Sequence, residues 1–189
     1  LTIAMEPVVS DEEQRLMLWQ AHHDNLTKLP NANLLHERLA RAAQQEKRGA
    51  LISVDLDGFK NANDSVGHAN ADRILTDAAL RIAMSARETD TVARMGSDHF
   101  VIMLPEIEDV AEVERVTRSA IDAFSAPFFV AEQELFIGVS AGVTIFPDDG
   151  RDKGELLQKA DAARLLAKAR GGNQAMFFED PVSYTHLRA

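Results

Sequence analysis

The sequence predicts an α+β fold in which helices flank a central, mainly antiparallel sheet. Two observations support this prediction. Apolar runs typical of strands occur largely in adjacent pairs, and segments with apolar residues at helical spacing separate them. Strands joined by short turns pair in an antiparallel manner, whereas the intervening helices have to pack on the faces of the sheet.

Length, charge and composition narrow the possible functions. The 189 residues are enough for one domain with some extension. The 20 Lys and Arg against 30 Asp and Glu give a net charge of -10, which argues against a partner such as a nucleic-acid polymer. A small nucleotide remains open, because a divalent cation can neutralise its phosphates. The absence of cysteine excludes disulfides and thiolate metal sites.

Membrane and targeting signals are missing from the sequence. No apolar run approaches membrane-spanning length, and the N-terminus lacks a signal-peptide pattern. We therefore expect no membrane contact by this segment and a cytoplasmic location, either alone or as the cytoplasmic part of a larger, membrane-anchored protein.

The first predicted helix lies before the compact part of the chain. Ser10 and Glu13 have the spacing of a capping box, and the helix that they begin should extend to about His23. The adjacent His22 and His23 suggest a metal site, but neighbouring helical residues point apart, so we interpret them as exposed histidines. Residues 1–23 are interpreted as a signalling or connector helix from something upstream.

A second helix and a central strand come next. Leucines and alanines at helical spacing predict a helix from about Ala32 to Arg48, ended by Gly49. The apolar run Ala50–Leu56 fits a strand that is buried on both faces of a sheet.

Two carboxylates, Asp55 and Asp57, lie where this strand ends. Acids in such a place are costly unless they pair with positive groups or hold a cation. We expect a polar turn over residues 63–68 and then a long helix that Asp72 opens and that extends to about Ala86. An acid at a helix start is also an ordinary partner of the helix dipole, so Asp72 alone would mean little.

The next two strands form a predicted hairpin with functional groups at its turn. The segments are Thr91–Met95 and His99–Leu104, joined by Gly96, Ser97 and Asp98. An acid at this tip is well placed for a metal or a phosphate, although Gly-Ser-Asp is also simply a good turn. We expect Asp98 to lie beside Asp55 at one sheet edge, where two carboxylates from separate elements would form a magnesium site that holds a nucleotide triphosphate.

The rest of the chain repeats the alternation of helices and strands. We expect a helix at Val110–Ser125, a hairpin of Pro127–Val130 with Glu134–Phe146, a helix at Lys153–Arg170 and a strand at Gln174–Phe178. The apolar residues of the first of these helices have core spacing and do not indicate a cofactor site.

Several motifs in order resemble those of GGDEF domains, the diguanylate cyclases. They are Asp24–Asn31, Asp55–Lys60 with Asn63, Asp64, Gly67, His68 and Asp72, the signature loop Arg94–Phe100, Ser140–Gly142, Phe146–Pro147, Asp149–Gly150, Ala160–Asp161, Ala167–Lys168 and Gly171. The resemblance covers about residues 24–178 and implies the palm-like, ferredoxin-like fold of nucleotidyl cyclases. Residues 179–189 have no counterpart and are interpreted as a tail or linker.

The resemblance implies a reaction and a set of site residues. Diguanylate cyclases join two GTP molecules, one held by each half of a head-to-tail homodimer, and the 3′-hydroxyl of each attacks the α-phosphate of the other. By position, the implied residues are Asp55, the Leu56 carbonyl and Asp98 for magnesium, Asn63 and Asp72 for guanine, and Phe59, Lys60 and Lys168 for phosphates. An amide and a carboxylate complement the acceptor and donor groups of guanine.

Five positions depart from the family pattern. His99 replaces a Glu that cyclase activity requires at this catalytic position, and an imidazole brings no negative charge, so the magnesium site is weakened. Gly172 replaces an Arg that grips phosphate, Ser97 and Ala71 replace glycines, and Leu165 replaces a common Tyr. Because the first two losses remove charge stabilisation of the transition state, we expect a domain without cyclase activity.

A second ligand site is implied just before the signature loop. Arg87 and Asp90 match the inhibitory RxxD motif, where GGDEF domains bind cyclic di-GMP. Arginine can contact guanine or phosphate in a bidentate manner, and aspartate can accept from the guanine N–H edge. An Arg and an Asp at this spacing also commonly form a plain surface ion pair.

Three functions remain open. The first is a degenerate, inactive GGDEF domain that binds GTP or cyclic di-GMP and regulates a neighbouring EAL-type or sensor domain. The second is a residually active diguanylate cyclase, and the third is a dimerisation scaffold without a ligand. GTP turnover separates the second function from the others, and ligand binding separates the first from the third.

Overall fold

A five-stranded sheet forms the centre of the protein in the computed structural model, which describes residues 8–179. The strand order is β2-β3-β1-β6-β7, with β1 Gly49–Leu56, β2 Thr91–Gly96, β3 His99–Leu104, β6 Val139–Phe146 and β7 Gln174–Phe177. Strand β1 pairs antiparallel with β3 and β6, β2 pairs antiparallel with β3, and β7 joins β6 in parallel. The predicted α+β fold with a mainly antiparallel sheet is confirmed.

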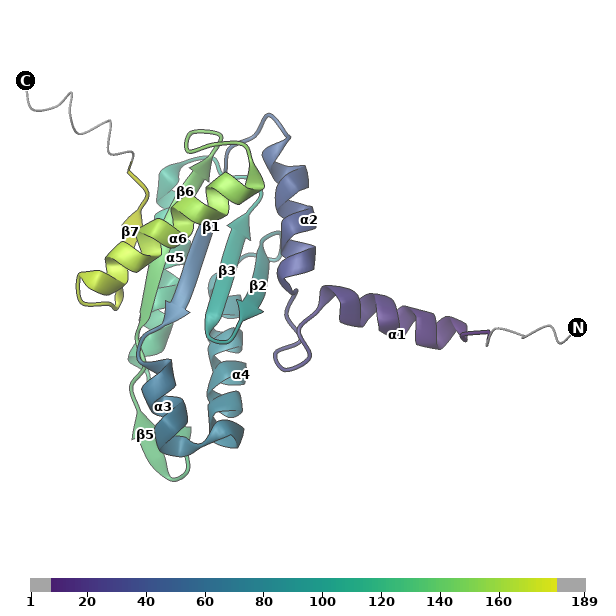
Figure 1. Ribbon diagram of the computed structural model, residues 1–189. Coiled ribbons are helices and arrows are strands. Elements are labelled where there is room, and N and C mark those ends of the chain that lie inside the picture. The colour runs from purple at the N-terminus through teal and green to yellow at the C-terminus, as the bar shows by residue number, and fades with distance from the viewer. Residues whose placement is uncertain (1–7, 180–189) are drawn as a thin grey trace, which may run out of the picture.

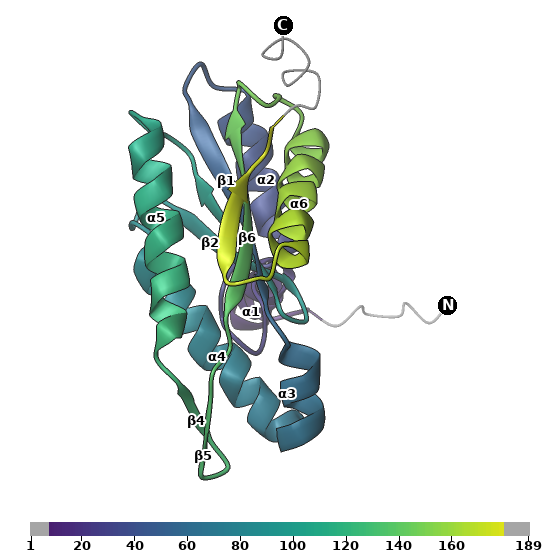
Figure 2. The same cartoon turned by 90° about the vertical axis from the view of Figure 1, so that its left-hand side faces the viewer.

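Helices cover both faces of the sheet. Helices α2 (Ala32–Ala43) and α6 (Lys153–Ala169) lie on one face, and α4 (His68–Ser85) and α5 (Val110–Asp122) lie on the other (Figures 1 and 2). Every residue of β1 and β6 is buried, as expected for central strands with helices on both sides. The end of β1 is therefore a rigid platform for the polar residues that follow it.

The second helix is shorter than predicted. Helix α2 ends at Ala43 rather than near Arg48, and Gly49 belongs to β1 instead of closing the helix. A Cβ atom at Gly49 would lie 2.1 Å from the Phe146 ring and 2.6 Å from the Leu104 carbonyl oxygen. The glycine is thus required by close packing within the sheet, a reason that helix periodicity does not reveal.

A short helix occupies the segment in which we predicted a polar turn. Helix α3 (Phe59–Val66) is anchored by the buried Phe59, and Gly67, with a φ of +81°, separates it from α4. Helix α4 therefore begins at His68, and Asp72 lies in its second turn rather than at its start. The prediction was wrong here because α3 is short and rich in Asn, Asp and Ser, residues that are also common in turns.

The second hairpin is also smaller than predicted. After α5 and the 3₁₀ turn η1 (Ala123–Ser125), strands β4 (Phe128–Val130) and β5 (Gln133–Leu135) form a separate two-stranded sheet. Ala131 and Glu132 both have positive φ angles, as in the two-residue turns that join the strands of a tight hairpin. Strand β6 then starts afresh at Val139 and pairs with β1, so the expected long strand Glu134–Phe146 is two strands.

Helix α1 (Asp11–His22) extends away from the sheet (Figure 1). The predicted capping box is present, since Glu13 N donates to Ser10 Oγ at 3.2 Å and Ser10 N donates to Glu13 Oε2 at 2.9 Å. His22 and His23 are half-buried rather than exposed, and each Nδ1 lies 3.0 Å from the carbonyl oxygen four residues earlier. Among the helices of residues 8–179, none has the length and apolar character needed to cross a membrane.

Candidate functional site

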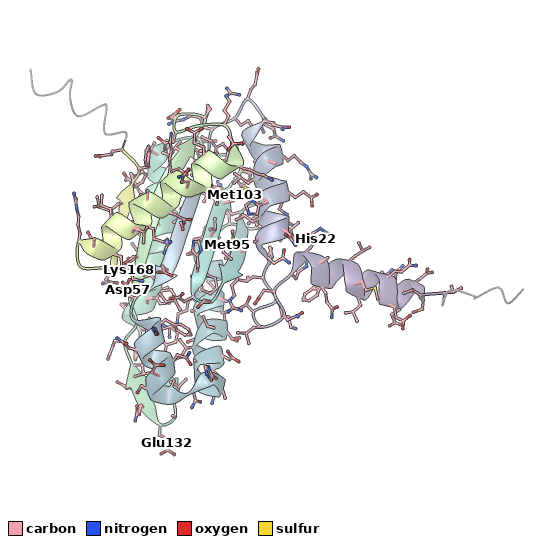
Figure 3. The ribbon with its side chains drawn as sticks, viewed as in Figure 1. His22, Asp57, Met95, Met103, Glu132 and Lys168 are labelled. Atoms are coloured by element: carbon pink, nitrogen blue, oxygen red, sulfur yellow. The ribbon has the colours of Figure 1, made fainter. Side chains whose placement is uncertain are left out.

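The strand acids, the signature turn and Lys168 gather where β1 ends and β3 begins, beside α6. Asp55 lies opposite His99 in the β1–β3 register, and Leu56 N donates to the Asp98 carbonyl oxygen at 3.3 Å. Figure 3 shows Asp57 and Lys168 beside one another at this end of the sheet. The structure thus brings the strand acids and the signature turn together.

Two cations hold the Asp55 carboxylate. Its Oδ2 accepts a hydrogen bond from Lys168 Nζ at 2.7 Å and lies 3.0 Å from Arg164 Nη1. The bond to Asp55 raises the pKa of Lys168, partial burial opposes this effect, and the Asp98 and Asp57 carboxylates reinforce it. The buried acid is therefore neutralised by protein side chains.

The imidazole of His99 is held by hydroxyl and carboxylate groups of the protein. Its Nε2 lies 2.7 Å from Ser53 Oγ and 3.4 Å from Asp161 Oδ1, and Ser53 Oγ donates to Asp161 Oδ1 at 2.6 Å. Burial raises the pKa of Asp161, but the bonds from His99 and Ser53 and the charge of Arg164 outweigh it and lower the pKa. The side chain in the catalytic signature position is thus committed to a contact with α6.

The signature turn leaves Asp98 with an unfavourable negative charge. Burial and the neighbouring Asp55 carboxylate raise the pKa of Asp98, and the positive charge of Lys168 only partly opposes them. Ser97 has a φ of +42°, a left-handed conformation that glycine adopts more easily than serine. The turn therefore keeps a glycine-like backbone although the glycine is gone.

Asp98→Asn is expected to stabilise the fold at neutral pH. Because the folded-state pKa is raised, the contribution of Asp98 to stability is present below the unfolded pKa, about 3.9, and is lost as the pH rises through the folded pKa. The side chain is half-exposed, so we expect a gain below about 1 kcal/mol. Urea denaturation at pH 7 and pH 3.5 measures it, and a variant that is less stable at pH 7 would contradict this assignment.

Asp57 is tied to the segment that follows α6. Its Oδ1 accepts from Ser140 Oγ at 2.6 Å, and its Oδ2 accepts from Asn173 N at 2.8 Å. Gly172 has a φ of +70°, and a Cβ atom there would lie 2.7 Å from Asp57 Oδ2. A side chain at position 172 would therefore require Asp57 to move.

The oxygen ligands implied for magnesium do not fit a divalent ion in this arrangement. Of the implied ligands Asp55, the Leu56 carbonyl and Asp98, the Asp55 carboxylate is already held by two side-chain cations. Within residues 8–179, no group of three or more His, Cys, Asp or Glu side chains is arranged to hold a metal. Magnesium is usually bound through one or two carboxylates together with waters and substrate phosphates, and two positive side chains at Asp55 oppose a further cation there.

The residues implied for guanine lie on α3 and α4. The Asn63 Oδ1 atom is buried and has no hydrogen-bond partner in the described structure. Asp72 lines a cavity of about 530 Å³ together with Leu26 and Leu29. Polar and apolar groups line this cavity, as in sites that bind a planar base, but Asn63 is not among the residues that line it.

The groups implied for phosphate differ in exposure. The Phe59 side chain is buried in the core, whereas Lys60 is exposed on α3 and the Lys168 side chain is 43% exposed. No side chain caps the N-terminus of α3, so Phe59 and Lys60 lie where its first N–H groups remain available as donors.

Arg87 and Asp90 form the ion pair that the RxxD spacing allows. Arg87 donates through Nε at 3.2 Å and Nη2 at 2.9 Å to Asp90 Oδ1, and its Nη1 donates to Glu112 at 3.0 Å. The Asp90 side chain is 0% exposed, whereas that of Arg87 is 43% exposed. Arg87 and Arg115 both line a cavity of about 460 Å³. The ion pair with the buried Asp90 carboxylate fixes the orientation of the Arg87 guanidinium.

Arg94 connects the opening motif to the signature turn. Its Nη1 donates to Asp24 Oδ1 at 3.1 Å, and its Nε donates to the Ser97 carbonyl oxygen at 2.9 Å. Both side chains of this ion pair are largely buried, with 13% and 21% exposed. This ion pair was not predicted from the sequence. The signal that could have revealed it is an Arg just before the turn together with an Asp at the start of the domain.

Arg94→Ala is expected to destabilise the domain by about 1–3 kcal/mol, because it leaves the largely buried Asp24 carboxylate without its positive partner. Burial raises the pKa of Asp24, but the bonds from Thr27 and Arg94 outweigh it and lower the pKa. The contribution of Asp24 is therefore present above its unfolded pKa, about 3.9, and is lost as the pH falls through the folded value. Urea denaturation at pH 7 checks the loss, and Arg41→Ala, at an exposed ion pair, should cost below about 0.5 kcal/mol.

Comparisons with known proteins agree with this fold and these motifs. The profile described as "Diguanylate cyclase, GGDEF domain" matches residues 21–174. The chain is 39% identical over 173 residues to the bifunctional diguanylate cyclase/cyclic di-GMP phosphodiesterase MucR of Pseudomonas aeruginosa, covering 89% of this chain and 25% of MucR. It is 33% identical over 177 residues to the diguanylate cyclase TpbB of the same species, covering 90% of this chain and 41% of TpbB.

Solved structures show the same likeness. The GGDEF domain of TpbB from Pseudomonas aeruginosa matches with a TM-score of 0.82 and 30% identity, over 88% of this chain and 100% of that one. A sensory box/GGDEF family protein from Caulobacter crescentus matches with a TM-score of 0.74 and 36% identity, over 79% of this chain and 99% of that one. The chain spans less than half the length of MucR and TpbB. It belongs to the GGDEF family of diguanylate cyclase domains and thus to cyclic di-GMP signalling.

Proposed function

We propose that this domain binds guanine nucleotides as a regulatory module and does not join two GTP molecules. The observation that carries the proposal is the state of His99, whose Nε2 contacts Ser53 and Asp161. Cyclisation needs negative charge to hold metal ions at the reacting phosphates, and this position supplies an imidazole that the protein itself binds. GGDEF cyclases generally use magnesium, so the poor fit of this site to a divalent ion supports the same conclusion.

Binding of GTP is supported by an amide oxygen that lacks a partner within residues 8–179 and by two charged side chains. The buried Asn63 Oδ1 can accept from a guanine N–H group, and the Asp72 carboxylate can accept from another. Lys168, which the acids keep protonated, supplies a positive charge for the phosphates near the uncapped start of α3. In this role the domain would bind one GTP molecule without promoting attack of a 3′-hydroxyl on its α-phosphate.

Binding of cyclic di-GMP is supported at the Arg87 cavity. Arg87 is exposed and held by Asp90, and Arg115 lines the same cavity, so two guanidinium groups can meet a doubly charged ligand. The buried Asp90 then acts by positioning Arg87 and not by touching the ligand.

The signal would pass to another part of a longer protein. Residues 24–178 form the GGDEF domain in this proposal, residues 1–23 act as its connector, and residues 179–189 act as a tail or linker. Of these, residues 1–7 and 180–189 lie outside the described part of the chain. MucR is described as both a cyclase and a phosphodiesterase, which supports an EAL-type or sensor neighbour, and a homodimer is the expected assembly.

Calorimetric titration with GTP tests the proposal. We expect GTP to bind and ATP not to bind, and we expect Asn63→Ala to weaken GTP binding at least about tenfold through the loss of a guanine hydrogen bond. Asp64→Ala, an exposed position on the same helix, is the matched control and should leave the affinity unchanged. Equal binding of GTP and ATP, or an Asn63→Ala variant with unchanged affinity, would overturn the guanine assignment.

A further inference from the structure

We infer that Arg164 is a built-in counter-ion that takes the place of a divalent metal at Asp55. The guanidinium Nη1 lies 3.0 Å from Asp55 Oδ2, and Arg164 Nε lies 3.5 Å from Asp161 Oδ1. The Asp55 side chain is 10% exposed and that of Arg164 is 13% exposed, so water screens this pair weakly. No motif or local pattern in the sequence marks this arginine.

The Asp55 carboxylate has two positive partners without a metal. Its Oδ2 atom contacts Arg164 and Lys168, and each of the other carboxylates here, those of Asp57, Asp98 and Asp161, also interacts with one of these two cations. A divalent cation bound to Asp55 would either displace Arg164 or Lys168 from Oδ2 or lie beside both of them at the same carboxylate. Either outcome is unfavourable, because it breaks a satisfied buried pair or causes repulsion between like charges.

Arg164 is the fixed member of the two cations, and Lys168 is the adaptable one. The Lys168 side chain is 43% exposed on a flexible stem, so it can turn toward a phosphate. The backbone of Arg164, in contrast, packs closely on β6, since a Cβ atom at Gly142 would lie 2.2 Å from Arg164 N. The Arg164 Nε atom is buried and has no hydrogen-bond partner in the described structure. Charge attraction to Asp55 and Asp161 therefore holds the side chain in place.

The inference predicts that the domain is indifferent to divalent cations until Arg164 is removed. We titrate the purified chain with Mn²⁺ in the absence of nucleotide and follow binding by electron paramagnetic resonance. The parent chain should bind no Mn²⁺ at Asp55, so its titration should match that of Asp55→Asn. Arg164→Leu should gain Mn²⁺ binding by at least tenfold, and its thermal midpoint should rise with added Mg²⁺ while that of the parent chain does not. Arg118→Leu, an exposed arginine on α5, should behave like the parent chain.

Arg164→Gln serves as the second variant, because it keeps polar contacts and removes only the charge. Circular dichroism establishes that each variant is folded, and Lys168 still pairs with Asp55 in both. Folded Arg164→Gln and Arg164→Leu chains that bind Mn²⁺ no better than the parent chain would overturn the inference. The inference would also be overturned if the parent chain bound Mn²⁺ and Asp55→Asn removed that binding. Neither result depends on nucleotide binding, so the proposed function is tested separately.

Discussion

Replacement of Gly142 with alanine is expected to cost about 3 kcal/mol or more, which is the upper range for overpacking a core. The new Cβ atom would lie 2.0 Å from the Ala160 carbonyl oxygen and 2.2 Å from Arg164 N. Both are backbone atoms of α6 and cannot rotate away, so α6 would have to shift off β6. Because α6 carries Asp161, Arg164 and Lys168, the shift would also open the polar network at Asp55.

Thermal and urea denaturation measure this cost. Gly154→Ala, on the same helix α6, is the control, since its Cβ would meet only the Asp152 carboxylate at 3.1 Å. It should change the stability by less than about 1 kcal/mol. A Gly142→Ala chain with an unchanged denaturation midpoint would show that α6 does not lie so close to β6. It would also contradict the position of Arg164 beside Asp55.

Arg87→Ala is expected to weaken cyclic di-GMP binding at least about 100-fold, or about 2.7 kcal/mol, as for an arginine that anchors a charged ligand. Arg87 is the exposed half of the pair, and the fully buried Asp90 cannot replace its contacts. Calorimetric titration measures the loss.

Two variants keep this test interpretable. Arg87→Lys retains the charge that pairs with Asp90 but loses the bidentate geometry, so it should fold and still bind more weakly than the parent chain. Arg151→Ala, exposed in the loop before α6, should leave binding unchanged. A folded Arg87→Ala chain with parental affinity would contradict the assignment of the cyclic di-GMP site.

The central part of the fold was predictable because its signals are strong. Ala50–Leu56 is too apolar for anything except a buried strand, and Gly96, Ser97 and Asp98 mark the reversal between β2 and β3. The short turn determines the antiparallel pairing of β2 with β3, whereas the pairing of β3 with β1, which places Asp55 opposite His99, is a contact between segments distant in the sequence. The two strand-end acids and the signature turn were therefore found from sequence alone.

The features that sequence reasoning missed depend on packing between distant segments. Helix α3 is only eight residues long and contains the turn-prone residues Asn61, Asn63, Asp64 and Ser65, so its sequence resembles a polar loop. Arg164 resembles any charged residue on a surface helix until α6 is seen to lie on β6 at Gly142. Its pairing with Asp55, 109 residues earlier in the numbering, is a tertiary contact that no local pattern encodes.

The most direct test of the account is product analysis after incubation of the purified chain with GTP and magnesium. We predict that the domain binds GTP and that chromatography detects no cyclic di-GMP, while a GGDEF cyclase with the intact signature forms it under the same conditions. Formation of cyclic di-GMP by this chain would contradict the central claim, because it would mean that His99, bound to Ser53 and Asp161, still supports the joining of two GTP molecules.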